Sequence, residues 1–195
     1  MISLDHYSRE YENFLDKSYC EILIEKFNNV WENNNKKVRE TSGCKGNCTA
    51  CYCNRVDINF HSEFQSDTQF IYSKIYEQLK IYKKDVGMLE NQFPVDVAYE
   101  AIRIKRYPAG EGEHKSHVDI TDINSSHRVL SFSINLNDDF EGGDLSFDLT
   151  GMRVKPQTGK LFIFPPLWPW QHAGEKCFKK DKYFLGTYLI YKRNQ

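Results

Sequence analysis

The sequence predicts an α+β fold, mainly β, in which N-terminal helices support a double-stranded β-helix core of the jelly-roll or cupin-like type. Helical periodicity is confined to the first half of the 195 residues, and short strands separated by Gly and Pro fill the second half. No internal repeat or linker divides the chain. We therefore expect a single domain over 1–195, with helical support in 1–95 and the β core in 96–195.

Two helices are expected in the first half. Apolar residues recur at helical spacing from Ser18 to Trp31, and again from Ser66 to Tyr82, with Gly87 as a typical stop. Both segments open with the pattern of a capping box, so we expect each helix to begin at its serine. Residues 41–55, rich in Gly, Asn and Cys, are expected to form a loop.

The second half is expected to contain five main strands. Residues 129–136 alternate between apolar and polar side chains, as in a strand with one buried face. The other apolar segments are bounded by turn residues such as Gly142 and Pro165. The expected strands are 97–107, 129–136, 145–149, 161–164 and 183–191.

Composition and charge exclude several classes of protein. The chain is 40% hydrophobic with a formal net charge of −1, and it has no basic stripe suited to nucleic acid. No apolar run approaches the ~20 residues of a membrane span, and the first residues lack a signal peptide. We therefore expect a cytoplasmic protein whose six cysteines are thiols or metal ligands.

A candidate metal site is formed by His117, Asp119 and His172. Residues i and i+2 of a strand project to the same side, so His117 and Asp119 are able to bind one metal ion from one strand. His172 follows another strand and the rigid segment Trp168-Pro169-Trp170. Two histidines and one carboxylate on one face of Fe(II) are typical of non-haem oxygenases.

Lys182 supplies the cation that such a site needs for 2-oxoglutarate. When the keto-acid end of 2-oxoglutarate chelates iron, its distal carboxylate requires a positive partner. Fe(II), Asp119, 2-oxoglutarate and Lys182 together have no net charge, as a closed pocket favours. Taken alone, Lys182 has the alternative of being a solvated lysine in a charged run.

The chain resembles the Fe(II)/2-oxoglutarate dioxygenases of the prolyl 4-hydroxylase type. The resemblance rests on motifs that occur in the same order, and it covers most of the chain outside roughly 41–94. These motifs are Tyr107-Pro108-Ala109-Gly110, His117-Val118-Asp119, Arg128 before Ile134-Asn135-Leu136-Asn137, Gly142-Gly143-Asp144-Leu145, Phe162-Ile163-Phe164-Pro165, His172-Ala173-Gly174 and Lys182.

The resemblance implies a role for each matching residue. His117, Asp119 and His172 would bind iron and carry catalysis, while Lys182 and Tyr107 would bind 2-oxoglutarate. The residues expected near the substrate are Arg128, His114, Tyr188 and Trp170. Alternatives remain: Arg128 as a surface ion pair, and Tyr107 and Trp170 as core residues.

The implied reaction couples conversion of 2-oxoglutarate and O₂ to succinate and CO₂ with hydroxylation of a substrate carbon, with ascorbate as reductant. We expect a peptide or protein substrate containing proline, and neither nucleic acid nor membrane as partner. The alternatives are a free amino acid, another protein side chain or a nucleobase. A catalytically silent binding module on the same scaffold is the alternative from another class.

Four cysteines form a second candidate metal site. Cys44, Cys48, Cys51 and Cys53 have the spacing C-x₃-C-x₂-C-x-C, and four thiolates suit tetrahedral zinc. The alternatives are a cluster that binds nothing and an iron–sulfur cluster. We expect zinc to stiffen a loop near the active site.

Overall fold

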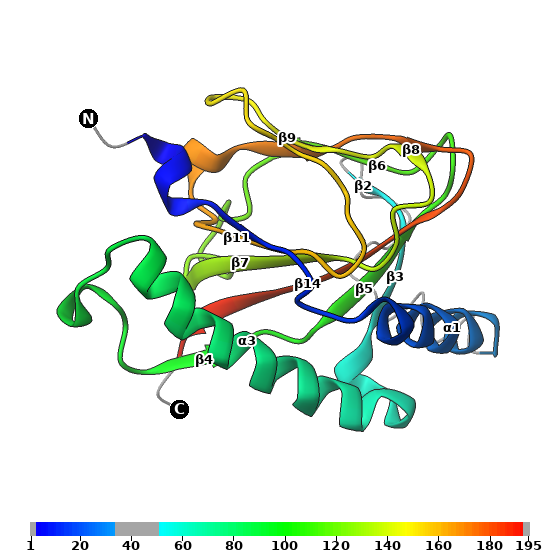
Figure 1. The fold of residues 1–195 in the computed structure, drawn as a ribbon, viewed down its shortest axis with the longest axis horizontal. Helices are drawn as coiled ribbons and strands as arrows, with labels where there is room; N and C mark the ends of the chain where they lie inside the picture. The colour runs from blue at the N-terminus through cyan, green and yellow to red at the C-terminus, as the bar shows by residue number, and fades with distance from the viewer. Residues whose placement is uncertain (1–2, 34–50, 193–195) are drawn as a thin grey trace.

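The computed structural model describes residues 3–33 and 51–192 and has two β-sheets packed face to face, with two helices behind the larger sheet (Figure 1). The strands of both sheets pair antiparallel. The predicted fold class, a double-stranded β-helix with N-terminal supporting helices, is confirmed.

The two predicted helices are α1 (Lys17–Asn33) and α3 (Gln65–Asp85). The predicted starts were wrong by one residue, because Ser18 and Ser66 lie inside the first turns. A 3-10 turn, η3 (Ser62–Phe64), runs directly into α3, and no side chain caps that helix. Each helix packs one apolar face against the larger sheet, including Leu23, Phe27 and Val30 of α1 and Ile71, Ile75 and Leu79 of α3.

The larger sheet lies between the helices and the smaller sheet. Leu130, Phe132 and Ile134 face the helices, while serines occupy the alternate positions, as the predicted alternation requires. Its strands, in spatial order, are β1 (Arg9–Tyr11), β11 (Leu161–Phe164), β7 (Arg128–Asn135), β14 (Lys182–Tyr191), β5 (Arg103–Tyr107) and β3 (Asn54–Asp57), with β4 (Val97–Tyr99) paired to β14.

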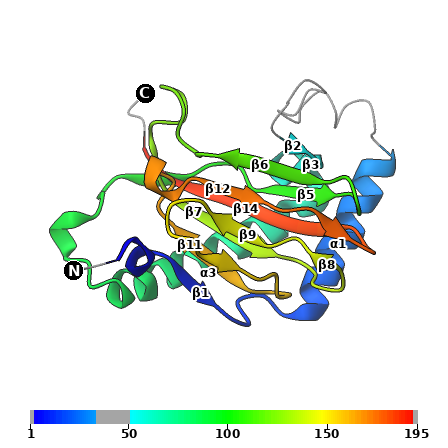
Figure 2. The same ribbon diagram turned by 90° about the horizontal axis from the view of Figure 1, so that it is seen from above.

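The smaller sheet covers the other face of the larger one, and Figure 2 shows its strands lying over it on the side opposite the helices. Its strands, in spatial order, are β10 (Arg153–Val154), β9 (Leu145–Phe147), β12 (His172–Gly174), β6 (Glu113–His117) and β2 (Cys51–Tyr52). A separate pair joins β8 (Glu141–Gly142) to β13 (Cys177–Phe178). The remaining 3-10 turns are η1 (Leu4–Tyr7), η2 (Ile58–Phe60), η4 (Glu90–Gln92) and η5 (Trp168–Trp170).

Two local predictions were wrong. The strand expected over 97–107 is interrupted between β4 and β5, where the Glu100 side chain bonds to two arginines. The end of the predicted loop 41–55 is not a loop, because β2 pairs with β6 and β3 pairs with β5. Unpaired edges of both sheets supply hydrogen-bond partners that local composition does not reveal.

The segment from Cys51 to Asp57 connects one edge of the smaller sheet to one edge of the larger sheet. It therefore closes one side of the space between the two sheets. Cys44 and Cys48 lie outside the described residues. Among the described helices, none has the length and apolar character needed to cross a membrane.

Candidate metal centre

The structure brings His117, Asp119 and His172 together between the two sheets. One ligand atom from each of the three lies within 4.8 Å of the other two. His117 ends β6 and pairs directly with His172, the first residue of β12. Asp119 follows β6 by two residues, so a single register of the smaller sheet positions all three side chains.

The hydrogen bonds of the two histidines fix which ring nitrogen faces the centre. Nδ1 of His117 lies 2.8 Å from the carbonyl oxygen of Lys115, and Nδ1 of His172 lies 2.8 Å from that of Trp170. A carbonyl oxygen only accepts, so each Nδ1 carries the proton and donates. Each Nε2 then presents a lone pair, as a metal ligand requires.

Asp119 supplies the third ligand atom. Its Oδ1 accepts a hydrogen bond of 2.6 Å from the Tyr188 hydroxyl, whereas its buried Oδ2 has no hydrogen-bond partner among the described residues. A buried carboxylate oxygen without a partner is unfavourable. A divalent metal ion would satisfy it, so the donor set fits Fe(II) bound by two imidazoles and one carboxylate.

The electrostatics of the centre favour the protonation states in which its side chains are able to bind a metal ion. Burial raises the pKa of Asp119, but contacts with His117, His172 and Tyr188 outweigh it and hold that pKa well below its usual range. Burial also lowers the pKa of His172. The structure thus favours a charged carboxylate beside a neutral imidazole, the protonation states that metal binding needs.

Lys182 and Tyr107 lie in the same pocket as the three candidate ligands, and their roles stay predictions. They are directly paired between β14 and β5. Lys182 is 6% exposed and its Nζ donates to the Gly143 carbonyl at 2.6 Å, and burial lowers its pKa to about 8. No acidic side chain within 3–33 or 51–192 forms an ion pair with Lys182, so this buried cation is suited to an anionic ligand.

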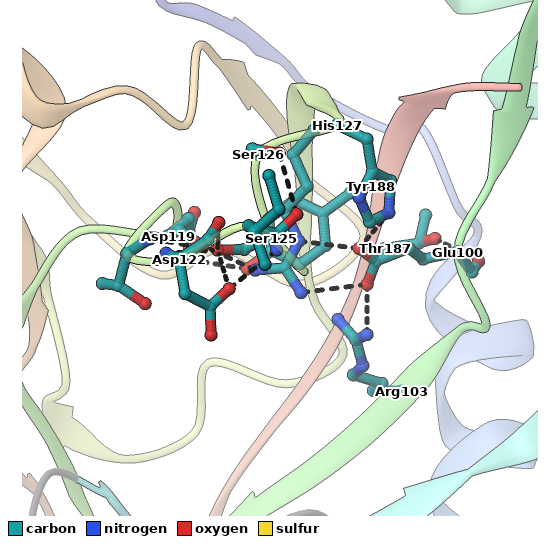
Figure 3. A network of polar contacts seen from close by, with 12 residues as sticks. Glu100, Arg103, Asp119, Asp122, Ser125, Ser126, His127, Thr187 and Tyr188 are labelled. Carbon is teal, nitrogen blue, oxygen red and sulfur yellow. Dashed lines mark hydrogen bonds and ion pairs between the residues drawn. The ribbon is translucent and has the colours of Figure 1, made fainter. Parts of the chain in front are cut away.

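Tyr188 and Arg128 connect the centre to an ion-pair network behind it. Figure 3 shows Asp119 and Tyr188 together with Glu100 and Arg103 of this network. The Arg128 guanidinium stacks on the Tyr188 ring, 4.0 Å from its centroid, and donates to the Asp119 carbonyl at 2.7 Å. Glu100 accepts from Arg128 at 2.7 Å and also pairs with Arg103. Both the side chain and the backbone of Asp119 are therefore held by this network.

The predicted substrate residues occupy different places. His114 and Tyr188 line the pocket, and the His114 ring stacks on His117 with a centroid distance of 3.6 Å. Arg128 and Trp170 are not among the residues that line it. Trp170 donates from Nε1 to Ser8 Oγ at 3.0 Å and packs in the apolar cluster beside His172. The substrate roles of all four residues stay predictions.

Sequence reasoning missed several pocket residues. Lys105 lies on the same face of β5 as Tyr107, two residues away, so strand alternation could have identified it. Ser131 and Ser133 are the polar face of β7 and also line the pocket. Glu100 does not line the pocket, but it holds Arg128, and no local pattern links these two residues because they are 28 positions apart.

Residues 102–190 match the family model described as 2OG-Fe(II) oxygenase superfamily, and this range contains the three candidate ligands and Lys182. Compared by sequence with curated proteins, the chain has no match.

Several solved structures have a similar fold. The viral collagen prolyl hydroxylase of Paramecium Bursaria Chlorella virus-1, in complex with 2OG, has a TM-score of 0.66 at 15% identity, covering 95% of this chain and 97% of that one. A Pseudomonas putida prolyl-4-hydroxylase has a TM-score of 0.67 at 16% identity, covering 96% of this chain and 94% of that one. A Trichoplax adhaerens prolyl hydroxylase, in complex with a hypoxia inducible factor peptide fragment, has a TM-score of 0.68 at 14% identity. The match covers 95% of this chain and 84% of that one.

Proposed function

We propose that this chain is a 2OG-Fe(II) oxygenase that hydroxylates a prolyl residue of a peptide or protein substrate, because residues 102–190 match the model of that superfamily. The reaction would convert 2-oxoglutarate and O₂ to succinate and CO₂. The observation that carries the proposal is one pocket that combines His117, Asp119, His172 and the buried Lys182. The titles of the similar structures support the choice of substrate, since they name prolyl hydroxylases and, for one, a bound peptide.

Each residue has a distinct task in this proposal. Nε2 of His117, Nε2 of His172 and Oδ2 of Asp119 would hold Fe(II), which when bound supplies the oxidising chemistry with O₂ and 2-oxoglutarate. Lys182 would bind the distal carboxylate of 2-oxoglutarate, with the Tyr107 hydroxyl beside it. This arrangement orients the co-substrate from the buried end of the pocket towards the metal.

Aromatic side chains pack against His172 on one side of the proposed metal centre. Phe147 and Phe164 contact the His172 ring, with centroid distances of 5.5 Å and 5.1 Å. Both phenylalanines are buried, so this side of the centre is apolar. A dry surrounding strengthens the metal–carboxylate and lysine–carboxylate interactions and suppresses side reactions.

Product analysis tests the proposal. Purified protein would be incubated with Fe(II), ascorbate and 2-oxoglutarate, with and without proline-rich peptides. Succinate would be measured, and mass spectrometry would locate an added oxygen atom in the peptide. We expect peptide-dependent succinate release and hydroxyproline, and neither with His172→Ala. If free amino acids or nucleobases stimulate succinate release, they replace prolyl peptides as the proposed substrate. If no succinate is released under any condition, a catalytically silent binding module is favoured.

Zinc binding by the four cysteines stays a prediction, and we propose it as a structural element beside the active site. Cys51 and Cys53 are the described members, and their sulfur atoms lie 2.8 Å apart. Cys51 pairs across the sheet with the pocket residue His114. Elemental analysis under reducing conditions should give about one zinc per chain. A zinc content that is negligible, or unchanged in Cys51→Ser, would contradict this.

A further inference from the structure

Lys105 is a cation of the pocket that has no partner of opposite charge among the residues that the structure describes. It lies in the middle of β5, on the face that lines the pocket. Within residues 3–33 and 51–192 its amine forms no hydrogen bond and no ion pair. The function proposed above assigns Lys105 no task, because Lys182 already serves 2-oxoglutarate.

The neighbouring cations on the same sheet face are all engaged. Arg103, two residues earlier on β5, pairs with Glu100. Arg55, directly opposite Lys105 on β3, bonds to Asp57 through Nε at 2.5 Å and Nη2 at 2.6 Å. Since its neighbours are paired, Lys105 stands out as a positive charge that faces the pocket and remains available to a ligand.

The anionic side chains of the pocket are committed to other groups. Asp119 belongs to the metal centre and accepts from Tyr188. Glu175 lines the pocket, but its carboxylate bonds to Arg153 at 2.5 Å. Neither carboxylate is therefore left to balance Lys105.

Two ring-bearing residues of the pocket lie near Lys105. Phe184 is directly opposite it on β14 and also lines the pocket. His114 lines the pocket too, with its ring stacked on that of His117. A bound ligand near Lys105 would thus meet one cation, one phenyl ring and one imidazole ring.

The charges of the pocket with Fe(II) and 2-oxoglutarate bound indicate which kind of substrate group it would accommodate. Fe(II), Asp119, 2-oxoglutarate and Lys182 together are neutral, and Glu175 is bonded to Arg153, which also pairs with Asp144. Lys105 lines the same pocket and forms no ion pair with any of the described residues, so its positive charge is left without a direct partner. Burying it beneath a neutral substrate would be unfavourable, whereas a substrate anion would form a charge-assisted hydrogen bond with it.

We propose that Lys105 binds a carboxylate of the substrate, and that the substrate is an acidic peptide with Asp or Glu next to the oxidised residue. This inference rests on the proposed function and narrows it from prolyl peptides in general to acidic ones. Lys105 is half-buried, whereas Lys182 is buried, so Lys105 is placed for the ligand that arrives from outside. Lys182, which is 6% exposed, is placed for the co-substrate at the buried end of the pocket.

Matched peptides test this assignment. Three proline-containing peptides would differ in one residue beside the proline, which is Glu, Gln or Lys. Their dissociation constants would be measured on protein loaded with Mn(II) and 2-oxoglutarate. Lys105→Met and Lys105→Glu are the test variants. Arg106→Met is the control, because it removes a positive charge from the same strand on the opposite face, where Arg106 lies over Trp31.

We expect the native protein to bind the Glu peptide about tenfold more tightly than the Gln peptide, as for a partly desolvated ion pair. Lys105→Met should abolish this difference without changing 2-oxoglutarate affinity, and Lys105→Glu should shift the preference to the Lys peptide. Arg106→Met should keep the native preference.

Three results would overturn the inference. They are equal affinity of native protein for the Glu and Gln peptides, no binding of any peptide, and a loss of 2-oxoglutarate affinity in Lys105→Met. Succinate release, measured on the iron-loaded protein, separates this inference from the proposed function. A Glu preference without any succinate would refute the function alone, and succinate release without a Glu preference would refute the inference alone.

Discussion

Replacing Tyr188 by Phe should weaken metal binding, because it removes one hydrogen bond and little else. The hydroxyl of Tyr188 donates to Asp119 Oδ1 at 2.6 Å, whereas His117 Nε2 lies 3.6 Å from that oxygen. Phe keeps the ring that stacks on the Arg128 guanidinium. The change therefore leaves the packing in place and releases the carboxylate.

The magnitude follows from the role of that bond. With Oδ1 held by Tyr188, Oδ2 is presented to the metal in one orientation. Without the hydroxyl, the carboxylate of Asp119 would rotate, and metal binding would have to restrict it again. Loss of such an outer partner typically reduces metal affinity about 10- to 100-fold, which corresponds to about 1.4 to 2.7 kcal/mol.

Equilibrium metal binding is the assay, with Mn(II) or Co(II) replacing the oxidisable Fe(II). The matched control is Tyr183→Phe, which removes a hydroxyl from the same strand. That hydroxyl bonds at 2.9 Å to Oδ1 of Asn28, a residue of α1. We expect native metal affinity in Tyr183→Phe. If Tyr188→Phe also binds metal within twofold of the native protein, the network does not orient Asp119.

Two further substitutions probe the pocket and the fold. Lys182→Met should raise the Kd of 2-oxoglutarate about 100-fold, through loss of a buried charge partner, while metal affinity is kept. Burial lowers the pKa of Lys182 to about 8, so above that pH the amine is neutral before 2-oxoglutarate binds. The native Kd should then rise about tenfold per pH unit, whereas the Kd of Lys182→Met should change little, and parallel pH profiles would argue against Lys182 as the anchor. Gly159→Ala should lower the free energy of unfolding by about 2 kcal/mol or more, since Gly159 has φ +74° and an added Cβ would overlap the Leu15 carbonyl. Gly151→Ala, with φ +70° and open space around it, is the control in urea unfolding, and equal losses in the two variants would show that backbone strain alone sets the cost.

Local patterns in the sequence determined the fold class and the metal ligands. Alternation over 129–136 sets which side chains of β7 face the helices, and this depends on neighbouring residues alone. The i, i+2 spacing of His117 and Asp119 likewise placed both near one point. These features are encoded within a few residues, so they could be predicted without knowledge of the tertiary structure.

The tertiary structure decided what each charged side chain does. Tyr188 and Asp119 are 69 residues apart, and their hydrogen bond exists because β14 and the end of β6 meet across the two sheets. Arg128 was expected near the substrate, but Glu100 and the Asp119 carbonyl occupy its guanidinium. In the sequence, Lys105 is indistinguishable from an ordinary strand lysine. The structure shows that Arg103 and Arg55 each pair with an acidic side chain, whereas Lys105 has no acidic partner among the described residues.

The sequence by itself therefore determined that the chain has a β core with two histidines and one carboxylate suited to iron. Which cations are neutralised and which remain for ligands was decided by strand register, because register selects the partner that lies opposite each side chain. Burial then sets the strength of each interaction, and burial depends on the packing of the two sheets and the helices together.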